Sequence, residues 1–349
     1  MDDFFEEYLR EKEPQKKEKG YAWHTAIGLQ AVDGLETSQY LIDTARKNIE
    51  GDITFEEADA LIHSYYRENA VYTSNDRTEE ADKVSVRIAQ LLSEKAFVFS
   101  PAQYLAVHQK LFSGIYKHAG KIRDYNITKA EWVLNGDTVM YGGARELRAT
   151  LDYDFSAERE FSYKGLSMEQ VIKHLAVFVS RLWQIHVFFE GNTRTTAVFF
   201  IKYLRTLGFD VTNDIFAENA WYFRNALVRA NYTNLQKGVH ETTEFLELFL
   251  RNLLLDENNE LKNRSMHISG TLNAPKCQKQ NANGTLDVTL DEMQVLSILK
   301  KDGKVTQKRL SEMIGKSERT VKRITASLEE KGHVKRMGGK RFGWWQVNI

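Results

Sequence analysis

A nine-residue segment from His186 to Arg194 holds the side chains with the clearest potential for chemistry. It contains an imidazole, a carboxylate at Glu190, a Gly-Asn pair and a guanidinium. Histidine titrates close to neutral pH, so His186 is the candidate general base. Glu190 offers the oxygen ligand that Mg²⁺ prefers. The segment therefore predicts a site for proton transfer beside a bound metal or phosphate.

Two apolar segments flank this polar loop and are expected to place it inside a domain. Upstream, apolar residues recur at helical spacing from Val171 to Ile185, after a capping-box start at Ser167 and Gln170. Downstream, residues 197–207 are apolar on nearly every helical face, and Gly208 is placed to end that helix. The backbone N–H groups and dipole at the start of the second helix favour anions, so we expect phosphate to bind there.

The loop resembles the signature of Fic proteins, His-Pro-Phe-x-Asp/Glu-Gly-Asn-Gly-Arg-x-x-Arg. A second block, from His108 to Arg123, is similar to the family's Leu-Phe, Tyr, Ala-Gly and Arg region. The resemblance covers residues 85–255. Fic enzymes are all-helical and transfer a nucleoside monophosphate, usually AMP from ATP, onto a side-chain hydroxyl of a target protein. The resemblance therefore implies an all-α catalytic domain that uses ATP and Mg²⁺.

The resemblance also assigns roles to individual residues. His186 would activate the target hydroxyl and Glu190 would hold Mg²⁺. The residues expected to contact the nucleotide phosphates are Gly191, Asn192, Thr193 and Arg194. Tyr222 and Asn225 lie in the helix that borders the adenine in this family and are candidates to contact it. For each, an ordinary core or surface position is the more common interpretation. A simple helix–turn–helix corner with solvated polar residues remains the structural alternative for the loop.

Two positions depart from the signature. Thr193 stands where the family has its second glycine, and Ala197 stands where it has its final arginine. A β-branched residue narrows the backbone choices near the phosphate, although its hydroxyl could cap the following helix. Loss of a charge-assisted contact to phosphate typically costs about 1.5–3 kcal/mol. We therefore expect slow transfer or a different nucleotide donor.

The segment 131–141 predicts a β-hairpin that turns at Asn135-Gly136. In Fic proteins a hairpin flap stands over the catalytic loop and pairs with the target segment as an added strand. Trp132, Val133 and Leu134 would then dock the protein target. The alternative is an ordinary surface hairpin.

Residues 1–84 are expected to form a helical arm, which resembles a small antitoxin family that plugs the nucleotide site of some Fic toxins. That family uses Ser/Thr-x-x-x-Glu-Gly/Asn, whose Glu pairs with the final arginine of the loop. Here Leu29 and Asp33 occupy the aligned positions, and Ala197 removes the partner. Asp33 is therefore the candidate inhibitory residue, with Arg194 as its available partner. Residues 64–69 also satisfy the bare pattern.

The C-terminal part reads as a separate unit. Residues 256–287 are polar and without periodicity, as in a linker. Residues 288–349 predict three helices and a hairpin, and they resemble a winged helix-turn-helix domain. They contain fourteen Lys and Arg but only seven Asp and Glu, within a chain of zero net charge. The candidate DNA-binding residues are Lys316, Arg319, Lys322, Arg323 and Lys340. Winged helices also mediate protein contacts, so that alternative stays open.

Global features set further expectations. The chain has three prolines, as suits a mostly helical protein, and no apolar run of membrane-spanning length. Its single cysteine, Cys277, excludes a disulfide within the chain and favours a cytoplasmic location without membrane contact. The nine histidines show no zinc-ligand spacing. A homodimer is compatible with the sequence.

Together these features predict a protein adenylyltransferase with a helical arm at 1–84, a catalytic domain at 85–255 and a winged helix domain at 288–349. The target could be another protein or the chain itself. Two alternatives remain: a catalytically weak, nucleotide-sensing transcriptional regulator, and a Fic transferase that uses a different nucleotide.

Overall fold

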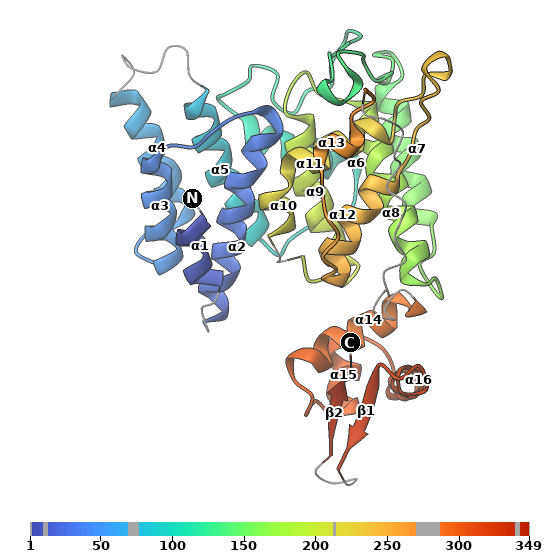
Figure 1. The fold of residues 1–349 in the computed structure, drawn as a ribbon. Coiled ribbons are helices and arrows are strands. Elements are labelled where there is room, and N and C mark those ends of the chain that lie inside the picture. Colours follow the sequence, from blue (N-terminus) through green and yellow to red (C-terminus); the bar gives the residue numbers. More distant parts are fainter. Residues whose placement is uncertain are drawn as a thin grey trace. The chain divides into compact units, whose positions relative to one another are not determined.

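The structure is a computed structural model, and it describes residues 2–9, 13–68, 77–211, 214–269, 287–338 and 343–348. Within these ranges the chain is mostly helical, and its one sheet is an antiparallel pair near the C-terminus (Figure 1). The expected all-α class is therefore confirmed. The chain divides into two compact units. One comprises Met1–Arg159, Ala176–Leu207 and Val211–Asn273, and the other comprises Glu160–Leu175, Gly208–Asp210 and Ala274–Ile349.

The N-terminal part of the first unit is the expected helical arm. Its elements are α1 (Asp2–Leu9), α2 (Pro14–Gly28), the 3₁₀ turn η1 (Leu29–Asp33), α3 (Gln39–Glu50), α4 (Phe55–Glu68) and α5 (Thr78–Ser93). Helices α2 and α5 pack side by side, as do α4 and α5 (Figure 1). Trp23 is fully buried, and its indole N–H donates to Asn48 Oδ1 at 3.0 Å. Gly34, with φ of 66°, ends η1 and places Asp33 at its last position.

The remaining helices of this unit surround the loop of interest. They are α6 (Pro101–Phe112), α7 (Leu147–Glu160), α8 (Met168–Ile185), α9 (Asn192–Thr206), α10 (Ile215–Glu218), α11 (Ala220–Arg229), η3 (Leu235–Lys237), α12 (Glu244–Leu255) and α13 (Asn263–Met266), with part of α7 and α8 in the second unit. Ser167 and Gln170 make the reciprocal hydrogen bonds of the expected capping box. Helix α9 is buried without interruption from Asn192 to Leu204, as its apolar sequence predicts.

Burial of α9 includes polar side chains, each of which has a partner. Thr196 Oγ1 shares a hydrogen bond of 2.8 Å with the Tyr104 hydroxyl. The Lys202 ammonium donates to the carbonyls of Leu91 and Glu94, both at 2.7 Å. Burial nevertheless lowers the pKa of Lys202 to about 8. Because these contacts tie α9 to the end of α5, they fix the helix that follows the loop.

The expected flap hairpin at 131–141 was wrong. Asn135 and Gly136 do form a tight turn with positive φ, closed by a hydrogen bond from Asp137 N to Leu134 O at 3.2 Å. The residues before it, however, form a 3₁₀ turn, η2 (Trp132–Leu134), instead of a strand. Val133 and Leu134 are both fully buried, whereas consecutive residues of a strand point to opposite faces. Burial of two successive side chains therefore excludes the strand predicted before the turn, although the turn itself forms.

The C-terminal domain has the three helices and hairpin predicted from the sequence. Its elements are α14 (Leu290–Lys301), α15 (Gln307–Ile314), α16 (Glu318–Glu330), β1 (Val334–Met337) and β2 (Trp344–Val347). Side chains of Thr289, Thr306 and Ser317 cap the three helices. In the hairpin, Arg336 pairs with Trp345. Two residues singled out in the sequence, Lys340 and Cys277, lie outside the described residues.

No helix of the described ranges is both long and apolar enough to serve as a transmembrane span.

Candidate active site

His108 of α6 holds the loop that joins α8 to α9. Its Nδ1 accepts a hydrogen bond from Gly120 N at 2.8 Å, so the proton lies on Nε2 and is donated to Glu190 O at 3.0 Å. Its ring stacks on Phe188 with centroids 3.7 Å apart. Burial lowers the pKa of His108 to about 4, which keeps the imidazole neutral at physiological pH. His108 therefore acts as a structural support for the loop.

The loop also braces itself. Asn192 Oδ1 accepts from Phe188 N and its Nδ2 donates to Phe188 O, both at 2.9 Å. Gly191 has φ of 72°, and a Cβ at this position would lie 2.4 Å from the Phe112 ring. Glycine is therefore required here by both conformation and space. The side chain of Asn192 shapes the loop, and its backbone begins α9.

Arg123 fixes the opposite side of the loop. Its guanidinium is buried and donates to the carbonyls of His186 at 2.7 Å, Tyr125 at 2.5 Å and Gly142 at 2.5 Å. The backbone N–H of Arg123 donates to Val187 O at 3.0 Å. With its donors committed to carbonyls, this arginine positions the backbone of the candidate base.

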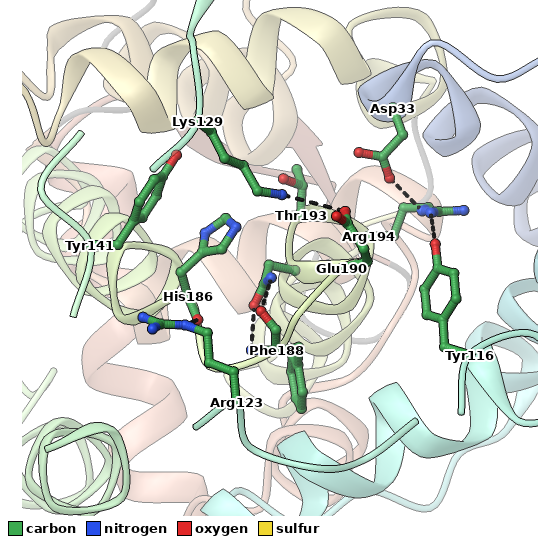
Figure 2. Close-up of polar contacts among 12 residues, drawn as sticks. Asp33, Tyr116, Arg123, Lys129, Tyr141, His186, Phe188, Glu190, Thr193 and Arg194 are labelled. Carbon is green, nitrogen blue, oxygen red and sulfur yellow. Dashed lines mark hydrogen bonds and ion pairs between the residues drawn. The ribbon is translucent and has the colours of Figure 1, made fainter. Parts of the chain in front are cut away.

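His186 itself is only 3 % exposed, and its φ of 51° is uncommon for a residue other than glycine. Neither ring nitrogen makes a hydrogen bond of standard geometry with the rest of the described chain. The ring packs against Tyr141, with centroids 4.3 Å apart (Figure 2). Burial, followed by the charges of Lys129 and Arg123, lowers its pKa well below the ordinary value, although the Trp183 carbonyl partly opposes this. The imidazole is therefore neutral and has both nitrogens available.

The two departures from the Fic signature have different surroundings. Thr193 Oγ1 accepts a hydrogen bond from the Trp183 indole at 2.9 Å, and the residue is 5 % exposed. Its hydroxyl thus satisfies a buried donor that glycine would leave without this partner. Ala197 is fully buried within α9. An arginine at 197 would therefore have to displace packed neighbours.

Arg194 is fully buried and bound by two carboxylates. Its Nε lies 2.8 Å from Asp33 Oδ2 (Figure 2). Its Nη2 lies 2.6 Å from Glu80 Oε1. Gln30 accepts a further hydrogen bond from Nη1 at 3.0 Å, and the guanidinium lies over the Phe112 ring. The expected pairing of Asp33 with Arg194 is present.

Glu80 was missed by the sequence reasoning. It also accepts hydrogen bonds from Arg77 at 2.8 Å and from the Tyr116 hydroxyl at 2.6 Å. Burial raises the pKa of Glu80, but the bonds from Arg77 and the charge of Arg194 outweigh burial and lower the pKa overall. The only local sign of its role was Arg77 three residues earlier. Such i,i+3 pairs of opposite charge are common on solvent-exposed helix faces, so the pair did not single out Glu80. Arg77, Arg194, Asp33 and Glu80 form a cluster of balanced charge.

Glu190 lies at the exposed side of the loop, where its side chain is 54 % exposed and 3.4 Å from the Lys129 ammonium. The described residues contain no group of three or more metal-ligating side chains. Glu190 therefore fits Mg²⁺ only in the way that this cation commonly binds, through one carboxylate together with water and substrate phosphates. When bound there, Mg²⁺ would neutralise phosphate charge.

Several side chains that were predicted to contact the nucleotide or the target are buried in the structure. Tyr222 is 2 % exposed, and its hydroxyl donates to Phe245 O at 3.3 Å. Asn225 is fully buried and donates to Asn263 Oδ1 at 2.8 Å. Both positions fit the core alternative noted in the sequence. In the flap, Trp132 is 47 % exposed but Val133 and Leu134 are fully buried, so their side chains are not presented to a target.

The predicted DNA-binding residues that are described lie on one element. Arg319, Lys322 and Arg323 are exposed on α16, and Lys316 lies exposed just before it. The Lys316 ammonium lies 3.1 Å from Asp291. The first half of α16 therefore presents three basic side chains to solvent.

Two segments of the chain match models of known protein families. Residues 98–204 match the Fic/DOC family, and residues 292–335 match the winged helix-turn-helix DNA-binding family. The chain thus carries a Fic-type transferase domain and a C-terminal winged helix domain of the DNA-binding type. A solved structure, a Fic family protein from Desulfovibrio desulfuricans G20, is 12% identical with a TM-score of 0.45, over 98% of this chain and 90% of that chain. No curated protein matches the chain.

Proposed function

We propose that this protein transfers AMP from ATP to a side-chain hydroxyl of a protein, which could be the chain itself. The observation that carries the proposal is the buried imidazole of His186, whose two ring nitrogens make no hydrogen bond of standard geometry with the described residues. Buried polar groups are normally satisfied, and exceptions gather at functional sites. An imidazole of this kind is suited to accept a proton from a substrate.

The low pKa of His186 fits a general base whose basicity increases when substrate binds. In the free protein the imidazole is neutral because burial and nearby cations disfavour its charged form. Negative phosphates beside it would favour the imidazolium and so raise its basicity when substrate is present. In the reaction, the hydroxyl oxygen bonds to the α-phosphorus, pyrophosphate leaves and His186 takes the hydroxyl proton.

The start of α9 supplies the phosphate site in this proposal. The N–H groups of Gly191, Asn192 and Thr193 lie at the N-terminus of a fifteen-residue helix, where the helix dipole favours anions. The polar side chains of Asn192 and Thr193 are engaged by Phe188 and Trp183. We therefore assign the phosphate contacts of these residues to their backbone.

Arg194 would reach the outer phosphates only after releasing a carboxylate. Its present partners balance its charge, and phosphate would compete with Asp33 and Glu80 for the same guanidinium. Asp33 is the more accessible of the two, with a side chain 26 % exposed against 11 % for Glu80. We propose that Asp33 holds the protein in a self-inhibited state.

The direct test is incubation of the whole protein with α-labelled ATP and Mg²⁺, alone and with candidate protein targets. Label on protein should depend on His186, because a general base contributes typically 10²–10⁴-fold to the rate. His186→Ala should abolish detectable labelling, whereas His240→Ala, at an exposed position of the same unit, should keep it. Absence of label with the unaltered protein, or label that persists in His186→Ala, would contradict the proposal. Competition with other nucleotides identifies the preferred donor.

A second candidate function is nucleotide-sensing regulation of transcription. The observation that favours it is the exposed basic side chains on α16 of a domain of the DNA-binding type. Binding of duplex DNA by the full chain should weaken steeply with salt and with the pair Lys322→Glu and Arg323→Glu. Nucleotide binding without protein labelling, together with such DNA binding, would favour this function over transfer.

A further inference from the structure

Lys129 is a cation in the active site to which no role has been assigned. It precedes the 131–137 turn, and its backbone N–H donates to Thr138 Oγ1 at 3.1 Å. Its side chain is 30 % exposed. Figure 2 shows the ammonium reaching past His186 toward Glu190. The turn thus anchors the backbone while the charged end lies beside the catalytic loop.

The ammonium is weakly engaged where it lies. Its partner is Glu190 Oε2 at a distance of 3.4 Å, and that carboxylate is more than half exposed. Exposed ion pairs of this kind contribute little because water screens both charges. Lys129 can therefore leave Glu190 for a phosphate at small cost, especially if a divalent cation takes its place on the carboxylate.

The guanidinium groups around the loop are already occupied. Arg123 is bonded to backbone carbonyls, and Arg194 is held by Asp33 and Glu80. Arg224 lies 2.7 Å from the buried Glu131. The arginine expected at the end of the signature is Ala197. A nucleotide brings several negative charges, so this site needs a cation that is free to meet them.

The position of Lys129 points to one particular phosphate. A base must lie near the attacking hydroxyl, so the phosphoryl group under attack lies on the same side of the loop as His186. Figure 2 shows the Lys129 side chain passing beside the His186 ring, and its charge contributes to the lowered pKa of His186. The ammonium and the imidazole therefore face a common space.

We propose that Lys129 binds the non-bridging oxygens of the phosphoryl group that is transferred, the α-phosphate of the nucleotide. This role rests on the proposed function and adds a residue to it. The proton of the hydroxyl still goes to His186, and Lys129 remains an ammonium throughout. Its charge stabilises the oxygens as the new bond to phosphorus forms and the bond to pyrophosphate breaks.

The test measures binding of AMP, ATP and adenosine by calorimetry in EDTA, where no transfer occurs. Lys129→Met should weaken the binding of AMP and of ATP by a similar factor. The expected factor is on the order of ten- to a hundredfold, as for loss of a charge-assisted hydrogen bond. Adenosine, which lacks the phosphate, should bind equally to both proteins. Lys129→Arg should recover part of the affinity. Lys110→Met is the matched control, because it removes a lysine that pairs with Glu94.

Each other outcome overturns the proposal in a distinguishable way. If Lys129→Met lowered the affinity for ATP but not for AMP, Lys129 would contact the leaving pyrophosphate and not the α-phosphate. Full recovery in the double variant Lys129→Met/Glu190→Gln would mean that Lys129 only shields a carboxylate. Unchanged affinity would remove the role of Lys129 while leaving the proposed transferase intact. Failure of the unaltered protein to bind either nucleotide, with or without Mg²⁺, would overturn both proposals.

Discussion

Two buried histidines flank the same loop and differ in one respect. His108 is fully buried and makes a hydrogen bond through each ring nitrogen. His186 is almost as buried, but neither of its nitrogens has a partner of standard geometry within the part of the chain that the structure describes. Both pKa values are lowered, with burial as the largest cause. Burial and pKa therefore do not separate a structural histidine from a chemical one; hydrogen-bond satisfaction does.

The comparison predicts effects of very different size on stability. His108→Ala removes two buried hydrogen bonds and a ring stacked on Phe188, so it should destabilise the protein by about 3–5 kcal/mol. His186→Ala removes an unsatisfied group and should change stability far less. Urea unfolding of both variants measures the difference. Equal losses of stability would break the distinction between the two residues.

The pH dependence of stability sharpens the same comparison. His108 has a folded pKa of about 4, whereas the ordinary value is 6.5. As pH falls below 6.5 the unfolded chain binds a proton that the folded chain does not, so stability is lost until pH approaches 4. This term amounts to about 3 kcal/mol for His108 alone. His186 acts in the same direction. Urea unfolding at pH 7.5 and pH 5 measures the part of this loss that has developed by pH 5, about 2 kcal/mol for His108.

The His186→Ala variant provides the control for that experiment. It should lose less stability between pH 7.5 and pH 5 than the unaltered protein, because one buried neutral imidazole is gone. Stability that stays level across this interval in the unaltered protein would show that the two rings are charged when folded.

A smaller effect, on nucleotide binding, is expected when Arg194 loses one of its two carboxylate partners. Asp33→Asn removes one carboxylate from Arg194 but leaves Glu80 in place. Arg194 would then meet phosphate more readily, and ATP affinity should rise by about tenfold, as for one charge-assisted contact. Calorimetric titration measures the change. Asp43→Asn on α3, whose carboxylate bonds to Gln39, is the matched control. Unchanged ATP affinity would remove Asp33 as an inhibitory residue.

Much of the fold followed from local patterns. The capping box at Ser167 and Gln170 and the apolar segment 197–207 predicted helices that the structure contains. The Asn135-Gly136 pair also predicted a real turn, yet the strands beside it were wrong. Turn chemistry depends on two residues, whereas strand formation depends on which faces are buried. The surroundings of Val133 and Leu134 decided that question.

Some residues of the candidate site could be predicted from the sequence, and others could not. His186, Glu190 and Arg194 could be singled out from type and spacing, and Asp33 from its place in the arm. Glu80 and Lys129 could not be singled out, because each carries a common surface charge that only packing brings to the loop. Tyr222 and Asn225 were expected beside the adenine, but their side chains bond within the core.

The sequence by itself determined which reactive groups are present and where the helices that carry the loop begin. Those properties depend on neighbours along the chain. Only the tertiary structure decided that, among the described residues, His108 has a standard hydrogen bond at each ring nitrogen and His186 at neither, and that Arg194 is held by carboxylates from η1 and α5. Hydrogen-bond satisfaction and charge balance depend on residues distant in sequence, so they arise only when the helices pack.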